Sequence, residues 1–452
     1  MPVSPARAAA FEVLLRVERE QSYAPELLHS SRFAKLSPSD HGLATEIVMG
    51  VLRWRCLLDL RLESASSQKL QRLDAEVLAA LRMGIYQLHF LSRVPARAAI
   101  FESVELVKAA RKRSAAPFVN AVLRKAGSAT AASAFEEIRQ AKDAGSLARA
   151  SAHPEWLVTR WVERFGVDLA RQVCIHNQTV PATTIHVYDE RAALELTAAG
   201  VQLGPGLLLS SARRVASGDV TQTLAQCEGR VSIQDEASQL VALLAGSGAR
   251  ILDCCAAPGS KTSLLAQRNP RSQIVACDVH PHRARLLRQL VQQPNVSVIA
   301  GDARHLPFAG GFDCVLADVP CSGTGTLARN PEIKWRLQPA DLLDLQSRQI
   351  AILKSALAQL APGGRLVYST CSLEREENED VVEAVVGDAG EFRISDCRQA
   401  LEVLERSGEL AWRDLDSLVD GPYLRTIPGQ HPGDGFFAAI IARSVGSWLP
   451  PG

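Results

Sequence analysis

Apolar residues recur at every third or fourth position over the first 127 residues of the chain. One such face follows Ser37-Pro38-Ser39-Asp40, a helix-start signature in which proline suits the first turn. Its positions, and those of a second face further on, are Leu43, Ile47, Val51, Trp54 and Leu58, and Val77, Leu81, Ile85 and Leu88. This spacing places the apolar side chains on one side of each helix. We therefore predict an all-helical domain over residues 1–127.

The pattern weakens in the middle of the chain. Residues 128–152 are rich in Ala, Ser and Gly and poor in large apolar residues, which is typical of a linker, partly helical over 135–141. A helical segment opens at His153-Pro154-Glu155-Trp156, and the strand-like pieces TTIHVYD and LGPGLLLSS follow it. We predict a small mixed α/β subdomain over residues 153–228. A helix signal over 235–244 then leads into the next domain.

From Arg250 onward, short apolar runs alternate regularly with helical patterns. The runs are ARILDCCA, QIVACDV, VSVIAGD, FDCVLADVP, RLVYSTC and FFAAIIARS. The intervening segments include helices over 281–292 and 339–360. This alternation predicts an α/β domain over residues 229–445, with a mainly parallel, seven-stranded sheet covered on both faces, as in Rossmann-like folds.

The stretch ILDCCAAPGSKTSLLAQ, residues 251–267, has the order of strand, tight loop and helix from which nucleotide sites are built. It is not a phosphate-binding P-loop, because Ser260 precedes Lys261 and Cys255 stands where the earlier glycine is needed. The three-glycine dinucleotide motif is also missing. Small side chains let a ligand approach the backbone, and free N–H groups at the helix start would bind a carboxylate. A strand and turn without a ligand remains an alternative at this point.

Acidic residues follow successive predicted strands. Asp278, Asp302 and Asp318 each stand at a strand end, and Asp278 lies 25 residues after Asp253, close to the offset at which an acid meets ribose hydroxyls. A single aspartate there often only caps the next helix. Three on successive strands favour a ligand with a ribose, a positive charge and no phosphate. S-adenosylmethionine (SAM) has these properties, and its carboxylate would sit at the Lys261 helix start.

Two cysteines stand at the ends of two of these strands. Cys321 lies in ADVPCSGTG and Cys371 in YSTCSLEREENED, and one crossover helix joins their strands, so we expect both thiols to face one crevice. Cytosine C5 is a poor nucleophile, but a thiolate that adds to C6 makes C5 able to attack a methyl group. A thiol of pKa about 8.5 must be partly ionised for this attack. A carboxylic acid at N3 and a second thiol would assist. Either cysteine alone is more often a buried thiol.

Composition adds few constraints. Hydrophobic residues make up 47% and charged residues 22% of the 452 residues, as in an ordinary globular protein. The net charge of +1 is uneven: residues 1–150 hold 22 Lys and Arg against 15 Asp and Glu, a net +7. This surplus favours a nucleic-acid partner, although solvated helix faces would also explain it.

The chain shows no sign of export, membrane insertion or metal binding. Glu12 and Arg16 interrupt the first apolar stretch, so we predict no signal peptide. Because no apolar run approaches the roughly 20 residues that span a bilayer, we predict no membrane span and a cytoplasmic protein. We also expect a monomer. The ten cysteines are expected to be reduced, and none has zinc-site spacing. We interpret His280 and His282 as loop histidines and predict no metal.

Three motifs together resemble those of the Sun/Fmu family of RNA cytosine-5 methyltransferases: DCCAAPGSKT, ADVPCSGTG and YSTCSLEREEN. VSIQDEASQL and RTIPGQHPGDGFFAAII resemble the motifs that flank them. VMGVLRWRCLLDLRL and FVNAVLRKAG resemble the RNA-binding fold of the NusB antitermination factor. This pairing, which covers nearly the whole chain, is similar to the bacterial 16S rRNA (cytosine-5) methyltransferase B family.

The resemblance implies roles for individual residues. Cys371 would attack C6, Cys321 would assist release, and Asp318 would contact both the base and SAM. The SAM site would comprise Cys255, Ala256, Ala257, Pro258, Gly259, Ser260, Lys261, Asp278, Arg283, Asp302 and Asp318. The family has a second glycine where this chain has Ser260, and we expect Ser260 to cap the following helix, to alter the loop geometry slightly and to leave binding intact. Cys254 is also unusual, and we expect it to be inert.

The resemblance also implies a substrate, namely 16S rRNA, either naked or in an early assembly intermediate. The family's usual target is cytosine 967 of that RNA. Two alternatives remain open from the sequence. One is a tRNA cytosine-5 methyltransferase, which needs the same chemistry. The other is a non-catalytic RNA-binding or antitermination protein that kept the fold.

Overall fold

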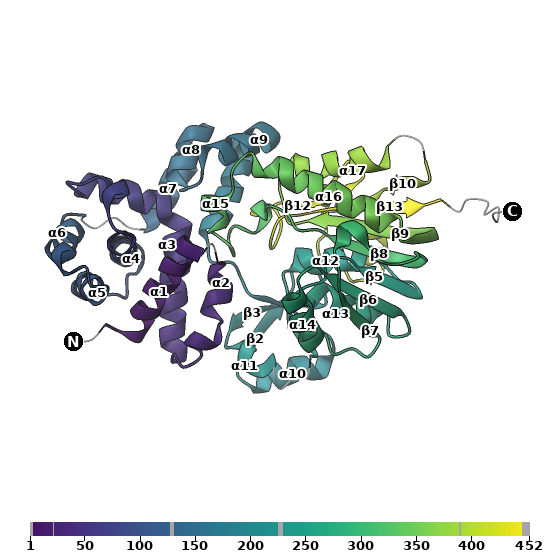
Figure 1. The fold of residues 1–452 in the computed structure, drawn as a ribbon. Helices are drawn as coiled ribbons and strands as arrows, with labels where there is room; N and C mark the ends of the chain where they lie inside the picture. Colours follow the sequence, from purple (N-terminus) through teal and green to yellow (C-terminus); the bar gives the residue numbers. More distant parts are fainter. Residues whose placement is uncertain (1–2, 21, 127–130, 225–228, 388–389, 445–452) are drawn as a thin grey trace. The chain divides into compact units, whose positions relative to one another are not determined.

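The structure, a computed structural model, describes residues 3–20, 22–126, 131–224, 229–387 and 390–444. The chain forms two compact units (Figure 1). The first comprises Met1–Val180 and Leu327–Arg336, and the second comprises Pro181–Thr326 and Leu337–Gly452. Among the described residues, none of the helices is both long and apolar enough to cross a membrane.

The first unit is helical, as the apolar spacing predicts. Its helices are α1 (Pro5–Glu20), α2 (Ala24–Leu28), α3 (Pro38–Ala65), α4 (Ala75–Phe90), α5 (Ala96–Ala109), α6 (Ala116–Lys125), α7 (Ala131–Gln140), α8 (Ala144–Ala150), α9 (Glu155–Gln178) and α15 (Ile333–Arg336). Helix α3 starts where its signature predicts, because the Ser37 side chain accepts a hydrogen bond from the Asp40 N–H at 3.2 Å. Ile47, Trp54 and Leu58 on its apolar face are at most 2% exposed.

The segment that we interpret as a linker is more ordered than its composition indicates. Residues 131–150 form α7 and α8, and the latter begins with a capping box between Asp143 and Ser146. Helix α9 follows and also belongs to the first unit. The expected boundaries at 127/128 and at 228, and the expected domain end at 445, lie outside the described residues. The expected boundary at 152/153 lies between α8 and α9.

Residues Leu327–Arg336 come late in the chain but pack within the helical unit. The buried Lys334 ammonium donates to the carbonyl oxygens of Arg53 at 2.7 Å and Ala152 at 3.1 Å. Trp335 donates its indole N–H to the Leu52 carbonyl at 2.7 Å. Burial lowers the pKa of Lys334 well below its ordinary value. This segment directly follows the loop that contains Cys321.

The second unit holds two sheets. The smaller is antiparallel with strand order β2-β3-β1-β4. Its elements, with the helices that accompany them, are β1 (Thr184–Val187), α10 (Glu190–Ala198), β2 (Gln202–Pro205), β3 (Ala212–Ser217), α11 (Val220–Leu224) and β4 (Val231–Ile233). Ile185, Leu196 and Val201 form part of its small core. The mixed α/β character predicted for this stretch is confirmed, although β3 and β4 were not expected.

The larger sheet has nine strands in the order β11-β12-β13-β9-β8-β5-β6-β7, with β10 paired to β13. The strands are β5 (Arg250–Asp253), β6 (Gln273–Asp278), β7 (Val296–Ala300), β8 (Phe312–Asp318), β9 (Leu360–Thr370), β10 (Phe392–Ser395), β11 (Val419–Asp420), β12 (Tyr423–Thr426) and β13 (Phe436–Arg443). Strands β5 to β9 are parallel, as predicted, and the others add an antiparallel edge. The predicted count of seven was too low, because strands of two to four residues such as β10 to β12 carry too little pattern to be recognised.

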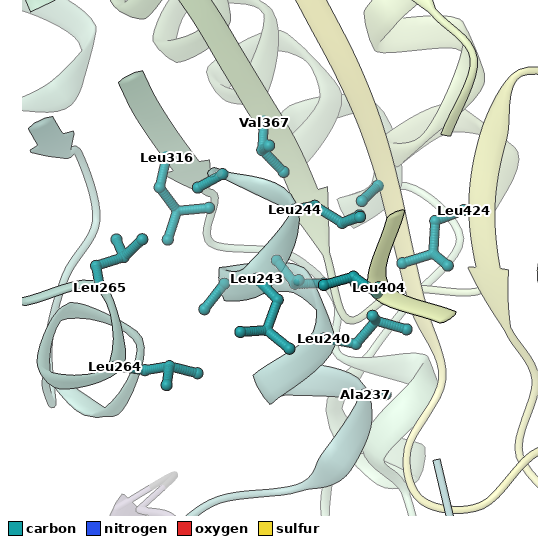
Figure 2. Packing of buried hydrophobic residues seen from close by; sticks show 14 of the residues in the cluster. Ala237, Leu240, Leu243, Leu244, Leu264, Leu265, Leu316, Val367, Leu404 and Leu424 are labelled. Carbon is teal, nitrogen blue, oxygen red and sulfur yellow. The ribbon is translucent and has the colours of Figure 1, made fainter. Parts of the chain in front are cut away.

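Helices cover both faces of this sheet. They are α12 (Glu236–Leu244), α13 (Ser260–Arg268), α14 (Pro281–Leu290), α16 (Asp341–Leu357), α17 (Glu379–Val386) and α18 (Cys397–Arg406). Figure 2 shows one core, in which Leu240 and Leu244 of α12 pack with Leu265, Leu316 and Val367. The residues that alternate with these along the strands pack with α16 and α17 on the other face. Burial on both faces explains the continuous apolar runs of the strands.

Candidate active site

The polar residues that follow the strands line one edge of the large sheet. Strands β9, β8, β5, β6 and β7 are neighbours and run parallel, so their carboxyl ends share this edge. Cys371 follows β9, Asp318 ends β8, Asp253 ends β5, Asp278 ends β6, and Asp302 comes two residues beyond β7. The prediction that β8 and β9 are parallel neighbours is confirmed. Ligands of open α/β sheets bind at such an edge.

The loop between β5 and α13 has the tight, small-residue course that its sequence predicts. Gly259 has φ 118°, and a Cβ there would lie 2.5 Å from Val291, so the position requires glycine. The loop backbone is tied to the next strand by the Ala256 N–H, which donates to the Cys277 carbonyl at 2.8 Å. The expectation that Ser260 caps α13 is wrong: Gly259 is the N-cap, and Ser260 is the first residue of the helix.

Asp253 was not among the predicted site residues, although it is also an aspartate at a strand end. It is 1% exposed, and its Oδ2 accepts a hydrogen bond from the Thr262 hydroxyl at 2.7 Å. Its Oδ1 has no hydrogen-bond donor among the described residues. Burial, together with the charge of Asp318, raises the pKa of Asp253 to about 7. A buried oxygen without a donor suits a ligand that brings its own N–H or O–H group.

Lys261 is directed at an aspartate of the neighbouring strand. Its Nζ lies 2.8 Å from Asp318 Oδ2, and the Ser369 hydroxyl donates to Asp318 Oδ1 at 2.7 Å. Burial alone would lower the pKa of Lys261, but the charge and hydrogen bond of Asp318 outweigh it and the pKa is raised. The lysine is therefore a cation at neutral pH and holds the carboxylate of Asp318 in a fixed orientation.

The other predicted acids differ from one another in their surroundings. Asp278 is 5% exposed and accepts from the His280 N–H at 2.9 Å, so it also caps the following turn. Arg283 lies between Asp278, at 3.9 Å, and the carbonyl oxygen of Ala257, at 3.2 Å. Asp302 is paired with Arg304 at 2.6 Å, and this hydrogen bond lowers the pKa of Asp302. The edge thus holds four carboxylates, of which Asp318, Asp278 and Asp302 each have a cation nearby and Asp253 is buried, and their oxygens suit a ligand that has hydroxyl groups.

The two predicted cysteines meet at the end of this row. Cys321 Sγ and Cys371 Sγ lie 3.3 Å apart, both are partly exposed, and both are free thiols. The hydrogen bond with Cys371, then burial, raises the pKa of Cys321 well above its ordinary value. Cys321 is therefore protonated at neutral pH. Cys254 is 1% exposed, and burial raises its pKa as well, so it is not a ready nucleophile.

This arrangement is suited to covalent chemistry on a planar ring. A thiolate at Cys371 has a proton donor or acceptor beside it at Cys321, and Asp318 at the end of the adjacent strand β8 is paired with Lys261 of α13. Such a reaction needs three kinds of group: a nucleophile, a neighbour that exchanges a proton, and a pair that stabilises charge. The described residues contain no group of three or more side chains that would hold a metal ion.

Comparisons with known proteins show which family the chain belongs to. Residues 240–442 match the family described as 16S rRNA methyltransferase RsmB/F, and residues 4–128 match the NusB family. The chain is 33% identical over 97% of its length to the probable ribosomal RNA small subunit methyltransferase B of Bacillus subtilis, of which 98% is covered. The chain belongs to the ribosomal RNA small subunit methyltransferase B family.

Another relative of this methyltransferase supports the same family, and a solved structure supports the fold. The ribosomal RNA small subunit methyltransferase B of Vibrio cholerae is 32% identical over 90% of this chain and 91% of its own length. The crystal structure of PH0851 shares the fold with a TM-score of 0.74 at 22% identity, covering 98% of this chain and all of that one. The methyltransferase therefore consists of a NusB-like helical region followed by an α/β methyltransferase domain, as its sequence motifs indicate.

Proposed function

We propose that this methyltransferase transfers a methyl group from SAM to C5 of a cytosine in 16S rRNA, of the cytosine 967 type, through a covalent bond between Cys371 and C6. The observation that carries the proposal is the 3.3 Å approach of the Cys321 and Cys371 sulfur atoms at the ends of neighbouring parallel strands. A single thiol at a strand end is common in proteins, but two partly exposed thiols within hydrogen-bond distance, beside a lysine–aspartate pair, support a catalytic role.

The residues of the sheet edge fit SAM, which supplies a methyl group on a sulfonium centre. Asp278 is the acceptor for the ribose hydroxyls, since it is an almost fully buried acid at the end of β6. The free Oδ1 of Asp253 is available to a donor of the ligand. The small residues from Cys255 to Gly259 allow the ligand to approach the backbone, and Arg283 supports this loop through the Ala257 carbonyl. Asp302 completes the site at its outer end.

The first chemical step belongs to Cys371. Its thiolate donates an electron pair to C6 and forms a carbon–sulfur bond, while the C5=C6 electrons move toward N3 and O2 of the ring. Asp318 contacts the base, and the Lys261 ammonium beside it stabilises the negative charge that grows on the ring. C5 then becomes nucleophilic and takes the methyl group.

The second step belongs to Cys321. It first loses its own proton to solvent, and its thiolate then removes the remaining proton from C5. The C5–H electrons re-form the C5=C6 bond, the C6–S bond breaks, and its electron pair returns to Cys371 as a thiolate. One proton is released per methyl group transferred, which balances the overall reaction. The neighbouring sulfur atoms allow this division of labour without a large movement.

Recognition of the RNA is assigned to the helical region, supported by its net charge of +7 over residues 1–150 and its match to the NusB family. Positive side chains neutralise phosphates and release counterions, so this contribution should depend on salt. The small sheet subdomain is a further RNA contact in this proposal. The target base must be unstacked, since C5 and C6 are out of reach inside a helix.

Incubation with SAM labelled in its methyl group tests the proposal. Three substrates should be compared: naked 16S rRNA, assembled small subunits and tRNA. We expect label in 5-methylcytosine of naked 16S rRNA, and none with the Cys371→Ala variant. Label in tRNA alone would assign a different substrate to the same chemistry. Absence of transfer to all three would overturn the enzymatic proposal and favour a non-catalytic RNA-binding protein.

A further inference from the structure

A buried carboxylate lies behind the two cysteine loops. Glu377 is 0% exposed, and among the described residues its side chain accepts hydrogen bonds from neutral donors, namely Ser322, Ser372 and Gln349. Oε1 accepts from the Ser322 N–H at 2.8 Å and from Gln349 Nε2 at 3.0 Å. Oε2 accepts from the hydroxyl groups of Ser322 and Ser372. A carboxylate is costly to bury unless donors satisfy its oxygens. Four donors satisfy those of Glu377, so the positions of these donors depend on its side chain.

These donors flank the two reactive cysteines. Ser322 follows Cys321, and Ser372 follows Cys371. Gln349 of α16 also donates to the carbonyl oxygen of Pro320 at 3.0 Å, on the other side of Cys321. Both peptide groups that flank Cys321 are therefore held, one by Glu377 directly and one through Gln349.

The Cys371 loop has a separate support. The Thr370 hydroxyl donates to Asn378 Oδ1 at 2.5 Å, and Asn378 Nδ2 donates to the Ser372 carbonyl at 2.9 Å. The Tyr368 hydroxyl donates to the backbone carbonyl of Glu377 at 2.6 Å, which fixes the turn that carries both Glu377 and Asn378. If the Glu377 side chain changes, the nucleophile loop loses the Ser372 hydroxyl bond but keeps its Asn378 anchors, whereas the Cys321 loop loses both bonds of Ser322 and keeps only that of Gln349 among those described above.

We propose that Glu377 is a positioning residue that orients Cys321 toward Cys371 and thereby controls release of the methylated RNA. The inference rests on the proposed function, because it assigns Glu377 to the second of the two cysteine steps. In that step, Cys321 must reach the C5 proton while Cys371 is still bonded to C6, and Glu377 would hold Cys321 in the position that this requires. Attack by Cys371 and transfer of the methyl group do not use the Glu377 side chain.

The geometry suggests a substitution that separates charge from shape. In Glu377→Gln the amide oxygen can still accept from Ser322 N–H and Gln349, and the amide nitrogen can donate to the two serine hydroxyls, which accept as well as donate. The variant should therefore fold, while its bonds to Ser322 lose the strength that an ionised acceptor provides. Ser322→Ala is a second, smaller change that removes the hydroxyl donor and leaves the Ser322 N–H in place.

The experiment follows labelled SAM and 16S rRNA through a single turnover with the full-length protein. Methyl transfer is measured as label in RNA, and the covalent intermediate as a slow-migrating protein–RNA band on denaturing gels. For Glu377→Gln we expect methyl transfer within about threefold of wild type and a covalent band that lasts about tenfold longer, as for the loss of a hydrogen bond to a charged group. Ser322→Ala should prolong the band by a smaller factor. Glu383→Gln, on the exposed side of α17, is the matched control and should match wild type.

Two further readouts distinguish positioning from a general structural role. Because the charge of Glu377 helps to raise the pKa of Cys321, after the Cys371 hydrogen bond and burial, Glu377→Gln should move the rise of the release rate to lower pH. The double variant Cys321→Ala/Glu377→Gln should release product no more slowly than Cys321→Ala alone, because both changes remove the same function.

The outcomes are separable. If wild-type protein transfers no methyl group, the proposed function fails before Glu377 is tested. If wild type is active and Glu377→Gln releases RNA at the wild-type rate and pH, the inference is overturned. Equal slowing of transfer and release, or additive effects in the double variant, would also overturn it, because Glu377 would then act on the whole site.

Discussion

The strongest physical prediction concerns Asp253, the buried acid at the end of β5. Burial raises its pKa from an ordinary value of 3.8 to about 7, and the native protein therefore binds one more proton than the unfolded chain between about pH 4 and pH 7. Stability must fall as pH rises through this window. At 1.36 kcal/mol per pKa unit, the full loss is about 4 kcal/mol, of which about 2–3 kcal/mol accrues between pH 5 and pH 8.

Replacement of Asp253 by asparagine removes this dependence. The amide oxygen still accepts the hydrogen bond of Thr262, but the side chain has no charge to desolvate. The difference in unfolding free energy, variant minus wild type, should therefore increase by about 2–3 kcal/mol from pH 5 to pH 8. Urea unfolding of both proteins at matched ionic strength across this range measures it. Asp344→Asn, at an exposed position on α16, is the control and should show no such trend. Parallel curves for wild type and Asp253→Asn would refute the argument from burial.

Three other predictions concern the loop, the ribose contact and the RNA-binding region. Gly259→Ala should lower the free energy of unfolding by about 2–4 kcal/mol in urea, because of its positive φ and the close packing around it. Gly408→Ala, with φ 75° and open space around it, should lower it by only about 1–2 kcal/mol. Equal losses would remove the packing argument. Asp278→Ala should weaken SAM binding about tenfold to a hundredfold by calorimetry, and an unchanged affinity would take Asp278 out of the site. The double change Arg124→Ala and Lys125→Ala at the end of α6 should lower rRNA affinity. The slope of log affinity against log salt concentration should fall in magnitude by about 0.7–0.9 for each phosphate that the variant no longer neutralises. An unaltered slope would mean that the RNA binds elsewhere.

The sequence predicts those parts of the site that depend on local pattern and topology. The apolar runs that end in Asp278 and Asp318 locate the sheet edge, and a single crossover brings Cys321 and Cys371 to neighbouring strands. Gly259 is recognisable because a tight turn between strand and helix requires a residue without a Cβ. These features need no knowledge of distant side chains.

The features that the sequence does not predict arise from contacts between distant residues. Nothing near Lys261 indicates that it pairs with Asp318, 57 residues later, and this pairing is seen only in the folded sheet. Glu377 lies in the charged run REENED, which is typical of an exposed helix start, yet the fold buries it. Lys334 is a similar case. It is buried within the helical unit, although the residues before and after its segment, Leu327–Arg336, belong to the other unit. Tertiary packing decides these cases.

The division of work between the two cysteines is the central claim about this enzyme. Each single variant, Cys321→Ala and Cys371→Ala, should be mixed with SAM and 16S rRNA and resolved on a denaturing gel. We predict a slow-migrating protein–RNA band from Cys321→Ala, which attacks and methylates but releases product poorly, and no such band from Cys371→Ala. A band from Cys371→Ala and none from Cys321→Ala would contradict this division of work.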